Sequence, residues 1–132
     1  MAGFIFKYML GGGVVYLTSF TVKAEESINK GDMCKITSGE AEPADTSDAT
    51  MYGAAANDAD AGEIVKLYPP DSVYAVVDAN ARSCADVLDL SNTSNGVAAK
   101  SNDDLIVVRN SGASDDTLLT LHSNAKIFAN AT

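Results

Sequence analysis

The sequence contains no tryptophan, one histidine, two cysteines and three prolines in 132 residues. A single histidine excludes a zinc site built from several histidines. Aromatic residues make up only 7% of the chain, which disfavours carbohydrate binding because flat aromatic side chains commonly line such sites. Much of the apolar content is alanine and valine. This composition favours β structure with small side chains over a thick aromatic core.

Basic residues are also scarce, with nine Lys and Arg against eighteen Asp and Glu, a net charge of −9. Residues 36–132 carry five basic and fifteen acidic side chains. Such a surface repels nucleic-acid phosphates, so no nucleic-acid partner is expected. It also keeps a protein soluble at high concentration. A chain of this length forms one domain that buries roughly two-thirds of its unfolded surface.

The first twenty residues differ from the rest because they contain no acidic residue and only one basic residue, Lys7. Five of the nine aromatic residues lie here: Phe4, Phe6, Tyr8, Tyr16 and Phe20. A signal peptide is an alternative, but the glycines at 11–13 interrupt the apolar run and no clean cleavage site follows. The run is also shorter than the roughly 20 residues of a membrane span. No membrane partner is expected.

The two cysteines, Cys34 and Cys84, lie fifty residues apart. Cys34 falls on an apolar position of the pattern described below, where an unpaired cysteine is common. Without an export signal, two reduced thiols are favoured, while a disulfide between them stays open.

The chain shows an internal repeat with an offset of 54 residues and no gap. Phe20, Tyr74 and Phe128 put an aromatic residue at the same step, and Asp32 falls on Asp86. The order of apolar runs and polar turns repeats, although few residues are identical. Two copies predict one body with pseudo-twofold symmetry, with units at about 20–73 and 74–128.

Apolar alternation and turn residues predict short strands every 8–12 residues and no helix. The expected strands are 14–23, 33–37, 40–44, 51–55, 63–68, 72–77, 87–91, 97–100, 105–108, 117–121 and 127–129. Residues 25–31 could hold one helical turn. This spacing indicates an all-β barrel or sandwich over residues 14–132. Residues 1–13 are predicted to form an extended apolar arm with a hinge at Gly11–Gly13.

The segment Asn57–Glu63 is the best metal candidate because it contains the Asp-x-Asp pattern of calcium loops. Gly62 falls where a third ligand belongs, so a solvated hairpin turn is favoured and no metal is expected. The pairs Asp103-Asp104 and Asp115-Asp116 are also interpreted as turns. Adjacent carboxylates in polar loops lack the apolar pocket that raises one pKa for acid–base work.

Cys34, His122 and an aspartate could formally make a nucleophile, base and acid set. His122 follows a predicted strand at the position of Tyr68 in the first unit, which favours an aromatic role there. Gly11–Gly13 lacks the Lys-Ser/Thr of a phosphate-binding loop. We therefore predict no catalytic residue, no cofactor and no enzymatic activity.

The arm is the remaining candidate site, because an exposed apolar segment needs a cover. Two interpretations stay open: the arm packs as a strand of its own domain, or it docks on a partner or sister subunit by strand addition or exchange. The candidate capsid- or subunit-binding residues are Phe4, Ile5, Phe6, Tyr8, Met9 and Tyr16.

The order of four short motifs resembles small bacteriophage capsid decoration, or head-stabilisation, proteins. In that family a Gly-Asp strand, a Gly-x-x-x-x-Ala strand, a Gly-x-Ala strand and an Ala-Gly-Glu turn follow one another. The matching segments here are Lys30–Ile36, Gly39–Ala44, Tyr52–Ala55 and Asp60–Leu67. The second copy departs from the pattern, with Val107 at the strand glycine and Asp115-Asp116 in place of Ala-Gly.

The resemblance implies a β-barrel or β-tulip-like body without enzymatic activity. It implies a partner, the major capsid protein, and self-association as a trimer. The location implied is the exterior of the virion, with the host cytoplasm during assembly. An adhesion or receptor-binding module of a phage fibre is the alternative, and no binding residue is transferred from the family.

Overall fold

The computed structural model describes residues 3–10, 12–44, 51–77, 81, 83–90, 97–98, 105–108 and 116–121. Within these residues the chain forms thirteen strands and no helix, so the predicted all-β class is confirmed. No helix in this part of the chain is long and apolar enough to span a membrane.

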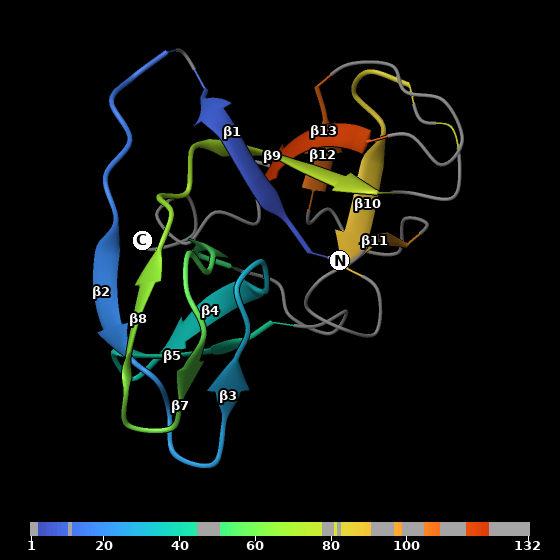
Figure 1. Ribbon diagram of the computed structural model, residues 1–132. Helices are drawn as coiled ribbons and strands as arrows, with labels where there is room; N and C mark the ends of the chain where they lie inside the picture. The colour runs from blue at the N-terminus through green and yellow to red at the C-terminus, as the bar shows by residue number, and fades with distance from the viewer. Residues whose placement is uncertain are drawn as a thin grey trace.

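The largest sheet has six strands, and all neighbouring strands in it are antiparallel (Figure 1). Its order is β1 (Ile5–Met9), β9 (Ser72–Val77), β13 (Asp116–Leu121), β12 (Leu105–Val107), β10 (Val87–Leu90) and β11 (Val97–Ala98). Apart from β1, this sheet comes from the second half of the sequence.

The first half forms three small antiparallel sheets (Figure 1). They are β2 (Thr18–Thr21) with β8 (Ile64–Leu67), β3 (Ser27–Ile28) with β7 (Ala59–Asp60), and β5 (Glu40–Pro43), β4 (Met33–Thr37) and β6 (Gly53–Ala54). None of the sheets among the described residues closes on itself, so the barrel expected from strand spacing does not appear there.

The main core joins the two halves of the chain. Its buried side chains include Phe4 and Met33 from the first half and Tyr74, Leu105 and Leu119 from the second. A second core of nine buried residues lies within the first half. Because the larger core draws on both halves, burial of apolar surface holds them together as one body.

Tyr74 is the centre of the shared core and is fully buried. Its hydroxyl accepts a hydrogen bond of 2.9 Å from the Ala54 backbone N–H. The ring packs edge-on against Phe4 and Tyr68, at centroid distances of 6.0 and 6.2 Å. Burial raises the pKa of the Tyr74 hydroxyl well above its ordinary value, so the group stays protonated. One side chain on β9 therefore connects β1, β6 and the segment after β8.

Several pairings recur with the predicted offset. Phe20 pairs with Val65 in the first half, and Tyr74 pairs with Leu119 in the second, so both partners lie 54 residues apart. The match then slips. Cys34 pairs with Gly53 whereas Leu88 pairs with Leu105, an offset of 54 for the first partner and 52 for the second. The gap-free alignment was therefore wrong at β6 and β12, and the division into two repeat units stays a prediction.

Candidate functional site

The predicted arm is, over Ile5–Met9, the edge strand of the six-stranded sheet. It pairs with β9 from Ile5 opposite Ala75 to Met9 opposite Ser72. The strand is anchored at both ends, because Phe4 donates its N–H to the Gly31 carbonyl at 2.9 Å and Leu10 donates to Asp71 at 2.8 Å. This arrangement corresponds to the first of the two interpretations, in which the segment packs on its own domain.

The six predicted interface residues are divided between the core and the surface. Phe4 is 2% exposed and belongs to the core, and Phe6 is half-buried with its ring stacked on Tyr68 at 4.6 Å. Met9 is half-buried, and its sulfur accepts a hydrogen bond from the Ser72 hydroxyl at 3.7 Å. Ile5, Tyr8 and Tyr16 are exposed. Only these three are available to a partner without unfolding the strand.

A β-bulge interrupts the edge that β1 presents. Phe6 lies opposite Tyr74 and Tyr8 lies opposite Val73, so Lys7 is the extra residue. Bulges and lysines on edge strands hinder pairing with another chain. Strand addition at β1, one of the docking modes expected from the sequence, is therefore disfavoured by the local backbone.

The exposed apolar residues concentrate in the connection between β1 and β2. Val14, Val15, Tyr16 and Leu17 are four consecutive exposed side chains, and Val14 is 88% exposed. The sequence predicted a strand from 14 to 23, but only Thr18–Thr21 pairs, with β8. On β8, pairing stops at Leu67 because two prolines follow at 69 and 70, and proline has no N–H to donate. We call residues 14–17 the apolar segment.

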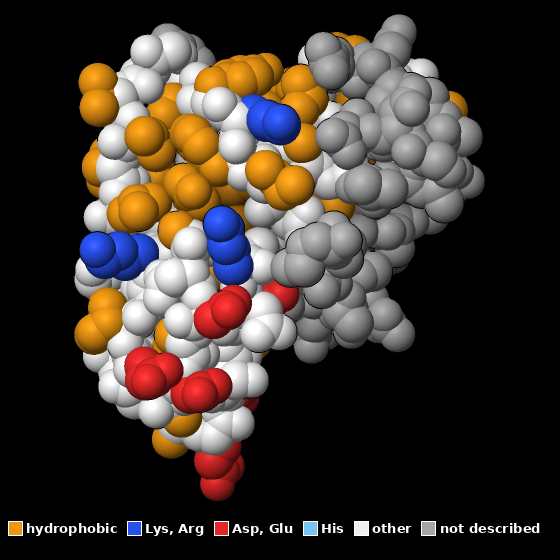
Figure 2. All heavy atoms as spheres, in the orientation of Figure 1, with side chains coloured by type: hydrophobic (Ala, Val, Ile, Leu, Met, Phe, Trp, Pro, Cys, Tyr) orange, Lys and Arg blue, Asp and Glu red, His pale blue; other side chains and the backbone are white. Residues whose placement is uncertain are grey.

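The surface is divided by charge along its length (Figure 2). Apolar side chains gather over the upper left of this face, near β1, β2 and β8, and acidic side chains gather at the lower end near β3 and β7. Exposed acidic residues of that end are Glu25, Asp58, Asp60 and Glu63. An apolar region without acidic residues is the part of an acidic protein that a partner can approach with least repulsion.

The calcium candidate at 57–63 forms a turn held by its own hydrogen bonds. Asn57 accepts from the Lys66 N–H at 2.8 Å and donates to the Ile64 carbonyl at 3.2 Å. Asp58 accepts from the Lys30 N–H at 2.7 Å, and Glu63 accepts from the Asp60 N–H at 2.8 Å. Within the described ranges, no three potential metal-ligating side chains gather.

The cysteines lie in different surroundings and are not bonded to each other. Cys34 is buried, and its thiol lies 3.4 Å from the Asp32 carbonyl oxygen. Burial, assisted by the charge of Asp32, raises the pKa of the Cys34 thiol, so the nucleophilic thiolate is disfavoured. Cys84 is exposed, with its sulfur 3.5 Å from the Val108 carbonyl oxygen. His122, Asp103, Asp104 and Asp115 lie outside the described residues.

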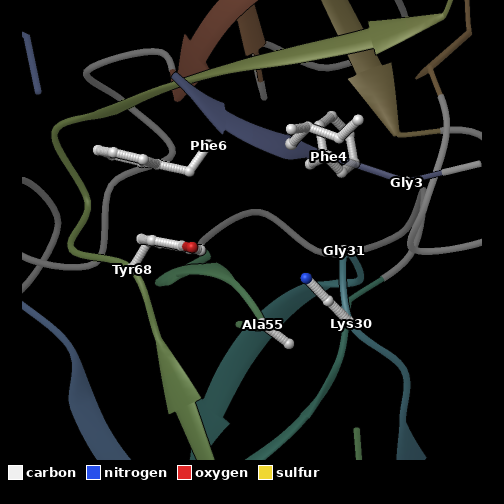
Figure 3. Close-up of a pocket in the computed structure, with 8 residues that line it drawn as sticks. Gly3, Phe4, Phe6, Lys30, Gly31, Ala55 and Tyr68 are labelled. Carbon is white, nitrogen blue, oxygen red and sulfur yellow. The ribbon is translucent and has the colours of Figure 1, made fainter. Parts of the chain in front are cut away.

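Sequence reasoning missed a cavity of about 340 Å³ between the start of β1 and the first half of the chain (Figure 3). Its lining residues are Gly3, Phe4, Ile5, Phe6, Lys30, Gly31, Ala55 and Tyr68. Gly3 and Gly31 meet here so closely that a Cβ on either would lie 3.2 Å from the other's Cα. The two glycines were the only signal in the sequence, since close backbone approach favours glycine.

No protein-family model matches the chain, and no curated protein matches it. A solved structure has a similar fold. The N base of head fiber gp8.5 in bacteriophage phi29 matches 81% of this chain and 95% of its own length, at 16% identity and a TM-score of 0.55. At this identity the likeness concerns the fold.

Proposed function

We propose that the chain is a structural virion protein of a bacteriophage head. One observation carries the proposal: its fold is similar to a phage head fiber base over 95% of that structure's length. The order of short motifs, which resembles phage capsid decoration proteins, supports the same role independently. We assign the chain no catalytic activity, and the burial of Cys34 agrees with this assignment.

In the more specific form of the proposal, the protein decorates and stabilises the capsid exterior by binding the major capsid protein. The apolar segment would supply the contact, together with Ile5 and Tyr8 beside it on β1. Burying each large apolar side chain contributes about 1.5–3 kcal/mol. Association as a trimer would multiply such contacts over the capsid lattice through effective concentration.

A second candidate is a base or adhesion module of a head fibre. The similar structure is itself the base of a head fiber, which specifically favours this role. Tyr8 and Tyr16 are exposed and could stack on a sugar ring. The absence of tryptophan makes carbohydrate binding the weaker form of this candidate.

The test is binding of the purified chain to capsids of the phage that encodes it, measured by cosedimentation and by capsid melting temperature. Leu17→Asp should weaken binding at least about tenfold, because one buried apolar contact is replaced by a charge. Ile64→Asp is the matched control, since Ile64 is equally exposed on β8 but lies outside the apolar segment. Its affinity should stay within about twofold of the wild type.

The outcomes separate the candidates. Equal binding by Leu17→Asp and the wild type would remove the apolar segment from the interface. Failure of the wild type to bind capsids, together with clear hits on a glycan array, would favour an adhesion module instead. Sedimentation equilibrium tests the trimer directly.

A further inference from the structure

The cavity beside β1 has apolar walls and two polar ends that face inward. The Phe6 and Tyr68 rings stack with an interplanar angle of 3°, and Phe4, Ile5 and Ala55 add further apolar surface. Figure 3 shows the Lys30 nitrogen and the Tyr68 oxygen facing the same space from opposite sides. Both groups donate hydrogen bonds.

Neither donor is used within the described part of the chain. The backbone N–H of Lys30 donates to Asp58, which fixes the main chain there, but its ammonium group makes no described ion pair. The Tyr68 hydroxyl has no described hydrogen-bond partner, and none of the eight lining residues is acidic. A positive charge beside apolar walls is stabilised by an anion, and charge-assisted hydrogen bonds are the stronger ones.

We propose that this cavity binds a peptide segment of a partner protein in which an apolar side chain precedes an Asp or Glu. The apolar side chain would lie on the Phe6–Tyr68 stack, and the carboxylate would accept from the Lys30 ammonium and the Tyr68 hydroxyl. A volume of about 340 Å³ is at the small end of ligand sites and suits such a pair of side chains.

Charge complementarity selects this occupant. The protein carries a net charge of −9, so an acidic segment is repelled by most of its surface. Lys30 is a local exception that would set the position and direction of the segment. The inference goes beyond the proposed role on the phage head, since it concerns binding by the purified chain alone.

The test is an NMR titration of the ¹⁵N-labelled protein with two matched peptides, acetyl-Leu-Phe-Glu-Ala amide and acetyl-Leu-Phe-Gln-Ala amide. We expect saturable shifts at the amides of Gly3, Phe4, Phe6, Gly31 and Ala55. The Glu peptide should bind about two- to fivefold more tightly than the Gln peptide, because Lys30 is exposed and its charge is screened.

Two variants and two controls make the result specific. Lys30→Met and Tyr68→Phe should each reduce the preference for the Glu peptide while the spectrum stays that of a folded protein. Lys66→Met and Tyr16→Phe alter an exposed lysine and an exposed tyrosine outside the cavity, and should keep the preference. No saturable shift at the lining residues, equal binding of both peptides, or an equal effect of Lys66→Met would overturn the proposal.

Discussion

The turn before β4 and the turn before β10 use the same hydrogen bonds with different residues. In the first, Asp32 accepts from the Asn29 N–H at 2.9 Å and donates its own N–H back to the Asn29 carbonyl at 3.0 Å. In the second, Asp86 does the same with Ser83, at 2.7 and 3.0 Å. Each aspartate therefore closes a turn at the start of a strand.

The residue before each aspartate differs in a way that reveals what the two turns must accommodate. Gly31 has a φ of 94° and Ala85 a φ of 73°, so both lie in the left-handed region. Gly31 is buried against Gly3, whereas Ala85 is exposed and has room for its methyl group. The same backbone is thus kept with glycine where space is lacking and tolerates alanine where space is free.

The largest effect is expected where the two halves differ most, at Gly53 and its pairing counterpart Leu105. A methyl group on Gly53 would overlap the Tyr68 carbonyl oxygen and crowd the Tyr74 hydroxyl. Gly53→Ala should therefore reduce the free energy of unfolding by about 3 kcal/mol or more, measured by urea denaturation. Gly13→Ala is the control, since nothing lies within 4 Å of its added methyl. Equal stability of both variants would contradict the close approach at Gly53.

The next effect should separate the two aspartates. Asp32 is 6% exposed and Asp86 is exposed, so the same hydrogen bonds are shielded from water only in the first turn. Asp32→Ala should cost about 2 kcal/mol, because hydrogen bonds to charged groups contribute about 1.5–3 kcal/mol. Asp86→Ala should cost less than about 1 kcal/mol. The comparison would fail if the two losses in unfolding free energy were the same.

The smallest effect should also change sign between the halves. Gly31→Ala should destabilise the protein by about 1–2 kcal/mol, because alanine is strained at positive φ and its methyl would press on Gly3. Ala85→Gly relieves that strain but increases the entropy of the unfolded chain, so stability should rise by no more than about 0.5 kcal/mol. Destabilisation by both exchanges would show that the second turn depends on its alanine.

Strong local patterns predicted much of the fold. The strands at 33–37 and 72–77 begin and end where expected, because alternation of apolar residues and flanking turn residues agree there. Other strands differ by one or two residues at their ends. The short strands β3 and β7 were missed, since two residues carry no periodic signal and Ser27–Ile28 lay in a stretch thought able to form a helical turn.

Contacts that depend on the rest of the molecule could not be predicted. The alternation from Val14 onward was interpreted as one strand, but a strand needs a partner, and the prolines at 69 and 70 end it. The arm was predicted to be extended, but not that Phe4 and Phe6 would be held by Tyr74 and Tyr68, more than sixty residues further along. The cavity follows from that packing and therefore had no local signature.

The pairing of β1 with β9 has a consequence for how the protein is made. On the ribosome, Ile5–Met9 is synthesised well before Ser72–Val77, the strand it must join. Until β9 emerges, Phe4 and Phe6 have no ring to pack against and remain in contact with water or a chaperone. Completion of the fold therefore waits for the middle of the message, and we expect a ribosome stalled before that point to carry a sticky nascent chain.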